Sequence, residues 1–114
     1  MNERLRRKER MSRQKDIDEC LRKGRRFEGG ALRFYVLANG LHHARLAIRI
    51  SRRVCNAVER SRWKRLIREA FRIRKTAVGM RGVDIVAVPR RPPGTLKRHD
   101  VETTIISLLS SPRP

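Results

Sequence analysis

Hydrophobic residues recur along the chain with two different periods. A period of two over residues 31–38 puts Leu32, Phe34 and Val36 on one side of a predicted strand and Arg33 and Tyr35 on the other. Residues 45–50 repeat this alternation, with Leu46, Ile48 and Ile50 as the apolar set. Two such segments predict an antiparallel sheet with one apolar face and one face that carries arginine and tyrosine.

A period near 3.6 appears over residues 59–72, which read ERSRWKRLIREAFR. On a helical projection the apolar positions fall within an arc of roughly 140°; they are Trp63, Leu66, Ile67, Ala70 and Phe71. The opposite side carries Lys64, Arg65, Arg68 and Arg72. The segment is therefore predicted to be an amphipathic helix with one side in the core and a cationic side about 20 Å long.

Turn and cap signals place the other elements. Ser12 is expected to cap a helix that runs to about Lys23 and stops at Gly24. The dipeptide Asn39-Gly40 predicts a hairpin between the two strands. VDIVAV, after Gly82, is a near-continuous apolar run typical of a strand buried on both faces.

A last helix is predicted over about 97–109, against a local preference of its Thr-Thr-Ile-Ile run for strand. The order is then αβββαβα, an α+β fold in which the strands before and after the basic helix are parallel neighbours. Residues 1–11 are expected to be a basic, flexible N-terminal lead-in, and residues 12–110 a single domain.

Charge points to the partner. Thirty Lys and Arg stand against eleven Asp and Glu, for a net charge of +19, so the chain attracts polyanions. A merely solvated helix face normally mixes charges of both signs, whereas the predicted basic helix carries Glu69 as its one acid between Arg60 and Lys75. A nucleic acid is the expected partner.

Two cysteines, Cys20 and Cys55, stand far apart without metal-ligand spacing, and His42, His43 and His99 do not cluster with them. Buried, inert thiols in a reducing cytoplasm are the expectation, with no metal bound by the protein. No apolar run approaches the ~18 residues of a membrane span, so no membrane partner is expected.

The chain lacks a self-sufficient catalytic constellation. Asp16, Asp18, Asp84 and Asp100 are scattered along the sequence, and no phosphate loop of the GxxxxGK type occurs. Catalytic residues are therefore predicted to be absent, and the protein is expected to support chemistry rather than perform it. Tyr35 beside Arg33 fits either a base-stacking position or a core aromatic with its hydroxyl at the rim.

The segment SRRVCNAVERSRWKRLIREAFR resembles the signature of the bacterial ribonuclease P protein subunit family. The family's Arg-Asn-Arg element reads Arg60-Ser61-Arg62 here, followed by Lys64-Arg65 and by REAF from Arg68 to Phe71. KGRRF, FYVLAN, RLAIRIS and VDIVAVPR follow the family's order, so the resemblance spans roughly residues 4–109.

The resemblance implies a two-layer α/β sandwich of the ribosomal protein S5 domain 2-like kind, with a left-handed βαβ crossover. It also implies a role in ribonuclease P, whose RNA subunit carries the active site and its Mg²⁺ ions. The protein would bind that catalytic RNA and precursor tRNA, and would aid endonucleolytic removal of the 5′ leader.

Carried over by position, the residues that face the catalytic RNA are Arg52, Arg53, Asn56, Arg60, Arg62, Lys64, Arg65 and Arg68. The leader would lie in a central cleft between the first helix and the sheet, at Ile17, Leu21, Arg33 and Tyr35.

Three positions depart from the family pattern. Ser61 replaces Asn, which loses a side-chain amide. Cys55 stands where the family has Gly, and is strained if that glycine needs a positive φ. Ile17 and Leu21 replace Phe, so they cannot stack on a base.

Two other readings remain open from the residues alone. One is a basic RNA chaperone or ribosomal-type RNA-binding protein without a nuclease role. The other, weaker, is a DNA-binding module that lays the basic helix in a major groove. It is weaker because Trp63 and Phe71 tie that helix to a core, and no DNA partner is expected.

Overall fold

The computed structural model describes residues 7–74 and 82–110. A short 3₁₀ turn, η1 (Arg7–Glu9), precedes α1 (Gln14–Lys23), β1 (Arg25–Gly29), β2 (Leu32–Ala38) and β3 (Arg45–Ile48). The elements that follow are α2 (Ala57–Arg74), β4 (Val83–Pro89) and α3 (Arg98–Ser110). This order of α-helices and strands, αβββαβα, confirms the predicted α+β fold.

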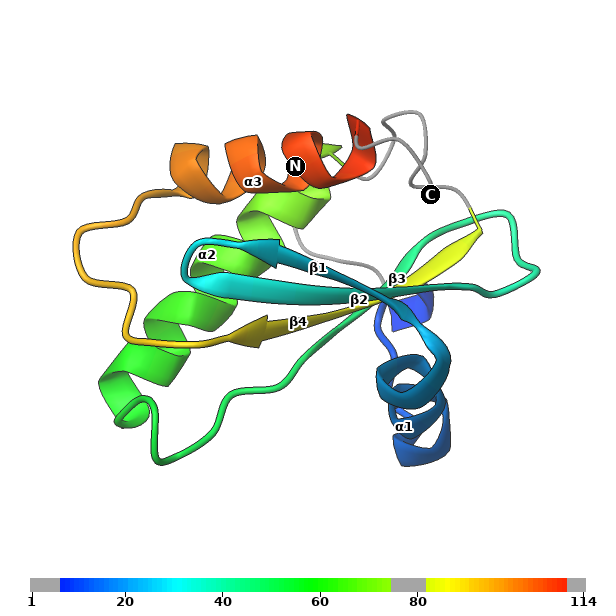
Figure 1. Ribbon diagram of the computed structural model, residues 1–114, viewed down its shortest axis with the longest axis horizontal. Coiled ribbons are helices and arrows are strands. Elements are labelled where there is room, and N and C mark those ends of the chain that lie inside the picture. The colour runs from blue at the N-terminus through cyan, green and yellow to red at the C-terminus, as the bar shows by residue number, and fades with distance from the viewer. Residues whose placement is uncertain (1–6, 75–81, 111–114) are drawn as a thin grey trace.

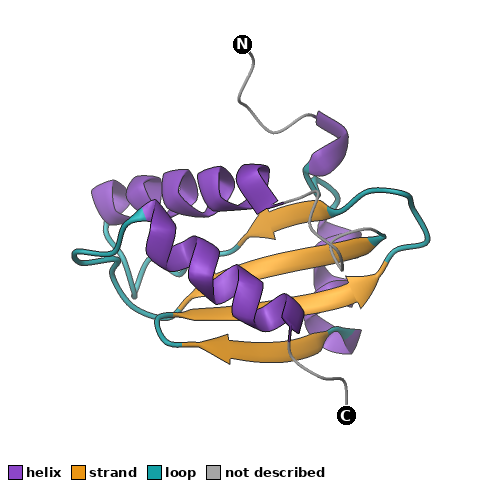
Figure 2. Cartoon of the chain, turned by 90° about the horizontal axis from the view of Figure 1, so that it is seen from above, coloured by secondary structure: helices purple, strands orange, loops and turns teal. Residues whose placement is uncertain are grey.

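The four strands form one mixed sheet in the order β1-β2-β4-β3 (Figure 1). β1 and β4 each pair antiparallel with β2, and β3 pairs parallel with β4. The strands on either side of the basic helix are therefore parallel neighbours, as predicted. With α2 towards the viewer (Figure 2) and both strands turned to point upwards, β4 lies to the left of β3. The crossover is left-handed, against the usual preference.

The prediction of a β-hairpin at Asn39-Gly40 is wrong. A turn exists there, with Gly40 at a φ of +71°, but β2 and β3 do not pair, because β4 lies between them. β4 is buried along almost its whole length, and a strand with two apolar faces gains most from the sheet's interior. The two alternating segments, expected to lie in one antiparallel sheet, are therefore separated by β4, which pairs antiparallel with β2 and parallel with β3.

Helices lie on both faces of the sheet. α2 and α3 cover one face, and α1 packs beneath part of the other (Figures 1 and 2). The α2/α3 side contains the larger core, in which Phe34, Trp63, Ile67 and Phe71 are almost fully buried. A smaller core on the α1 side comprises Met11, Ile17, Cys20, Ala47 and Val86.

The first helix begins later than the sequence indicates. Arg13, not Ser12, occupies the N-cap position of α1, and no side-chain cap hydrogen bond forms. The helix ends at Gly24 as predicted, but Gly24 has an extended backbone, with φ −67° and ψ 151°, rather than the left-handed conformation of a typical glycine cap. A glycine is required there by space, since a Cβ would lie 2.3 Å from the backbone oxygen of Cys20.

Part of the predicted lead-in contacts the sheet. The backbone N–H of Met11 donates to the oxygen of Leu46 on β3 at 2.9 Å, and Glu9 and Met11 are buried. Residues 1–6 lie outside the described residues. The division between a lead-in and a domain at residue 11 stays a prediction.

Candidate nucleic-acid interface

The N-terminus of the basic helix α2 is closed by a reciprocal capping box. The side-chain oxygen of Asn56 accepts the N–H of Glu59 at 2.8 Å, and a carboxylate oxygen of Glu59 accepts the N–H of Asn56 at 2.9 Å. This arrangement satisfies two backbone donors at the helix start. Asn56 therefore caps the helix in addition to its predicted RNA contact. The NxxE spacing before an apolar run could have revealed this cap from the sequence.

The two sides of α2 separate as the sequence predicts. All five apolar positions of the arc are buried against the sheet and α3. The opposite side of the helix is exposed at Lys64, Arg65 and Arg68, as predicted, and also at Ser61 and Arg62. Arg72, predicted on the same side, is instead partly buried and pairs with Glu69 at 3.0 Å. Because the buried side cannot rotate out of the core, the exposed cations hold a fixed direction away from the sheet.

Two of the arginines are held by backbone carbonyls. Arg60 donates through Nη1 to the oxygen of Cys55 at 2.9 Å, next to the start of the helix. Arg62 donates through Nη2 to the oxygen of Leu96, in the segment between β4 and α3. These contacts orient the two guanidinium groups on either side of exposed Ser61, so the Arg-Ser-Arg element is partly preorganised.

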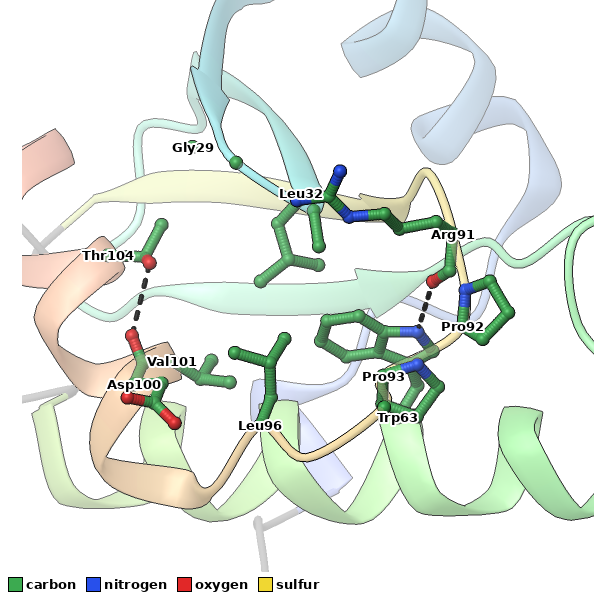
Figure 3. Close-up of a pocket in the computed structure, with 13 residues that line it drawn as sticks. Gly29, Leu32, Trp63, Arg91, Pro92, Pro93, Leu96, Asp100, Val101 and Thr104 are labelled. Carbon is green, nitrogen blue, oxygen red and sulfur yellow. Dashed lines mark hydrogen bonds between the residues drawn. The ribbon is translucent and has the colours of Figure 1, made fainter.

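Trp63 fixes the segment that receives Arg62. Its indole Nε1 donates to the oxygen of Arg91 at 2.8 Å, and its ring has no exposed surface. A hollow of about 420 Å³ lies beside it, walled by the β1–β2 turn, residues 91–96 and the start of α3 (Figure 3). Since the ring is covered and its N–H is satisfied, Trp63 serves as an anchor for residues 91–96 rather than as a stacking surface.

The loop before α2 is built around Ser51. Its backbone oxygen accepts the N–H groups of Val54 and Cys55, and its side chain accepts the N–H of Arg53 at 3.1 Å. Arg52 and Arg53 are exposed on this turn. Among the described residues positive φ occurs only at glycines, so Cys55 is not strained in the way that its replacement of a family glycine suggested. Burial raises the pKa of the Cys55 thiol, consistent with an inert side chain.

The four predicted leader residues all belong to the α1 side of the sheet. Arg33 and Tyr35 project from β2 on that side, and Ile17 and Leu21 lie on α1. Ile17 is only 8% exposed and packs in the smaller core, so its position favours a supporting role. Leu21 and Tyr35 are half-buried at the edge of the same core. The half-buried ring of Tyr35 fits the reading of a core aromatic at the rim, and the base-stacking reading stays a prediction.

α1 covers only part of this face. Its core contacts include Ala47 and Val86, which lie in register with Tyr35. The next row towards the β1–β2 turn contains Glu28, Arg33 and Val88, also in register across three strands. Figure 1 shows α1 beneath the opposite end of the sheet from that turn. The α1-side face therefore combines a helix-covered part with an open part.

Sequence reasoning missed the acid in this open part. A carboxylate oxygen of Glu28 accepts the Nε of Arg33 at 2.6 Å, and Glu28 lies 3.8 Å from Arg26 and 3.6 Å from Arg90. Arg33 also donates through Nη1 to the hydroxyl of Tyr35 at 3.5 Å. The pKa of Arg33 is raised, first by the hydrogen bond to Tyr35 and then by that to Glu28. The available sequence signal was the opposite charge of Glu28 and Arg33 on either side of the Gly29-Gly30 turn, where two antiparallel strands would place them opposite each other.

A polar network ties α1 to the sheet on the same side. Arg45 donates from Nε and Nη2 to the two carboxylate oxygens of buried Asp84, at 2.8 and 2.7 Å. Arg45 also lies 3.6 Å from Asp16 on α1, and Asn39 donates to Asp84 at 2.8 Å. The hydrogen bond to Asp84, its leading cause, raises the pKa of Arg45. These charged and polar groups bind one another and hold α1 in position against the sheet.

The described residues offer neither a cluster that could hold a metal nor a helix that could span a membrane. Within residues 7–74 and 82–110, no three His, Cys, Asp or Glu side chains come together in a way that could hold a metal ion. Over the same residues, no helix has the length and apolarity that crossing a membrane requires. Both cysteines are buried as predicted, and they are unpaired.

The fold and its basic helix define a class: a small α+β protein that binds RNA. A family model described as Ribonuclease P matches residues 5–112, and the chain therefore belongs to the bacterial ribonuclease P protein family. Members of this family are the protein component of an endoribonuclease that acts in tRNA processing, so the chain is an accessory subunit of that holoenzyme.

Individual relatives agree. The ribonuclease P protein component of Pelotomaculum thermopropionicum is 34% identical over 99 residues, which are 87% of this chain and 88% of that protein. The component from Syntrophobacter fumaroxidans is 39% identical over 89 residues, or 78% of this chain and 73% of that protein.

Solved structures agree on the fold. The Staphylococcus aureus RNase P protein superposes with a TM-score of 0.75 at 26% identity, over 89% of this chain and 92% of that one. The Thermotoga maritima protein gives a TM-score of 0.74 at 26% identity, over 99% and 100% of the two chains. The predicted family and fold are thereby confirmed.

Proposed function

We propose that the protein serves its holoenzyme through two surfaces. The exposed side of α2 and the loop before it bind the catalytic RNA, and the α1 side of the sheet binds the 5′ leader of precursor tRNA. The observation that carries this proposal is the fixed outward direction of the α2 cations, which together form a basic surface. Among the described residues of this helix face, Glu69 is the only acid, and it pairs with Arg72.

The RNA surface comprises eight residues in one continuous segment: Arg52, Arg53, Asn56, Arg60, Arg62, Lys64, Arg65 and Arg68. Arginine's planar fork suits phosphate oxygens, and the start of α2 adds backbone donors to the same region. Such contacts position the protein without reading sequence. Specificity for the catalytic RNA would then come from the shape that the segment matches.

The leader surface comprises Ile17, Leu21, Arg33 and Tyr35. Tyr35 offers a half-buried aromatic ring beside an oriented guanidinium, a combination suited to single-stranded RNA. Ile17 and Leu21 would pack beneath the strand without aromatic stacking. Mg²⁺ ions would be held by the RNA subunit, where the chemistry occurs, and the complex would work in the cytoplasm.

Reconstitution tests the assignment. The protein is mixed with a bacterial ribonuclease P RNA and a 5′-labelled precursor tRNA at low Mg²⁺, where the RNA alone is slow. We expect cleavage at the mature 5′ end to rise, with no cleavage by protein alone. Tight RNA binding without any stimulation would instead favour an RNA chaperone or ribosomal-type protein.

Arg65→Ala tests the RNA surface. Arg65 lies in the middle of the exposed side of α2, so its loss should weaken catalytic-RNA affinity and reduce the log–log salt slope by about 0.7–0.9 per lost phosphate contact. Arg62→Ala should act in the same direction, with an added effect from the lost bond to Leu96. Arg22→Ala, which removes an exposed arginine from α1, is the matched control. Slopes equal to wild type in both α2 variants would contradict the assignment.

Tyr35→Ala tests the leader surface. Binding to the catalytic RNA should be unchanged, while the preference of the holoenzyme for leader-bearing tRNA over mature tRNA should fall. The loss should correspond to about 1–3 kcal/mol if the ring stacks on a base. Tyr35→Phe keeps the ring and removes only the hydroxyl near Arg33, so it should retain most of the preference. Equal losses for both tRNAs would make Tyr35 a core residue only.

A further inference from the structure

Glu28 stands at the point where three guanidinium groups converge. It contacts Arg33 at 2.6 Å and lies within 4 Å of Arg26 and Arg90. These arginines come from β1, β2 and the residue after β4, so the convergence depends on the pairing of β2 with both β1 and β4. The open part of the leader surface thus has an anion already in place.

Stability accounts for little of this arrangement. The side chain of Glu28 is 48% exposed, those of Arg26 and Arg90 are 59% and 47% exposed, and only that of Arg33 is largely covered, at 22%. Ion pairs at such exposure contribute little to folding. Without Glu28, however, three like charges would remain close together on the face where an RNA strand is proposed to lie, and a phosphate would be drawn to them.

We propose that Glu28 is a specificity-determining residue of the leader surface. Its carboxylate occupies the anion position between Arg26, Arg33 and Arg90, and this closes the position to a phosphate of the bound strand. The strand is then held at this part of the sheet through base or ribose contacts at Tyr35. The inference rests on the proposed leader role of the α1 side.

A strongly basic protein needs a residue that disfavours non-specific phosphate contacts. At a net charge of +19, phosphate contacts would bind any single strand in any register, because they carry no sequence information. Specific recognition commonly includes an element that penalises the wrong arrangement. Glu28 penalises a phosphate at this position and also holds the guanidinium of Arg33 against Tyr35.

Glu28→Gln separates charge from geometry, since the amide oxygen can still accept the Nε–H of Arg33. The control is Glu19→Gln, which makes the same charge change at a carboxylate that is 44% exposed and pairs with Lys23 on α1. Both variants are assembled with the catalytic RNA. Dissociation constants for leader-bearing and mature tRNA are then measured across a salt series.

We expect Glu28→Gln to bind leader-bearing tRNA at least threefold more tightly than wild type at low salt, with mature tRNA unchanged. The salt slope for the leader-bearing substrate should steepen by about 0.7 for each phosphate gained. Glu19→Gln should leave the ratio of the two affinities and the difference between their slopes as in wild type.

A second measurement locates the gained contact. Replacing single leader phosphates by uncharged methylphosphonates should reveal at least one position that weakens binding by Glu28→Gln and leaves wild-type binding unchanged. Identical scans of the two proteins would overturn the proposal, as would a Glu28→Gln variant that binds the leader no more tightly than Glu19→Gln. A wild-type holoenzyme that fails to prefer leader-bearing tRNA would overturn the leader role itself, which is a separate and recognisable failure.

Discussion

At the scale of single residues, Cys20 links α1 to the sheet and creates a pH dependence. Its buried thiol donates to the oxygen of Tyr35 at 3.4 Å. Burial, and secondarily the charge of Asp84, raises the thiol pKa from 9.0 to about 11. The folded state therefore keeps this proton to higher pH than the unfolded state, so the stability linked to it is complete below pH 9 and declines between pH 9 and 11.

Urea midpoints between pH 8 and 11 check this expectation. Lysines also titrate in this range, so the comparison is between wild type and Cys20→Ala, which share all of them. Wild type should lose more stability than the variant from pH 9 to 11, although Cys20→Ala is expected to be less stable at pH 8. Parallel pH profiles would contradict the coupling.

Asp84 is the second residue on which the α1 side depends. It is 5% exposed and receives two hydrogen bonds from Arg45 and one from Asn39. Asp84→Ala should destabilise the protein by about 3 kcal/mol, because the half-buried guanidinium of Arg45 loses both of its hydrogen bonds to a carboxylate and keeps only the longer contact with Asp16. Chemical denaturation measures this, with the exposed Asp18→Ala as the control. A loss no larger than the control's would show that water replaces the carboxylate.

At the scale of elements, the capping box makes the start of α2 a distinct unit. Asn56→Ala should cost about 1 kcal/mol of folding stability, and Asn56→Ser should restore most of it because a hydroxyl can still accept the N–H of Glu59. Catalytic-RNA affinity measured on both variants then separates the two duties of Asn56. If Ser restores stability and affinity together, the residue acts only as a cap.

The elements also show where local patterns suffice. The arc from Trp63 to Phe71 predicted both the burial and the exposed side of α2, because a helix buries one face whatever it packs against. The Asn39-Gly40 signal failed because a turn dictates local chain reversal and not the partner of a strand. The apolar run of β4 outweighed it by taking the position between β2 and β3.

At the scale of the whole molecule, charge opposes compactness. A net charge of +19 on 114 residues repels itself unless anions bind. Pyrophosphate should therefore raise the melting temperature more than sodium chloride at equal ionic strength, and stabilisation should reach about 2.7 kcal/mol at 100 times the dissociation constant. Calorimetry with both salts checks this. Equal shifts would indicate screening alone.

The sequence by itself determined the elements, the basic side of α2, the burial of both cysteines and, through ordered motifs, the family. These follow from periodicity, composition and local spacing, which act within one element. Only the tertiary structure decided the strand order, the contact of Arg62 with Leu96, and the convergence of three arginines on Glu28. Those depend on which strands become neighbours and on which loops reach a helix, and contacts between residues distant in the chain leave no periodic trace in it.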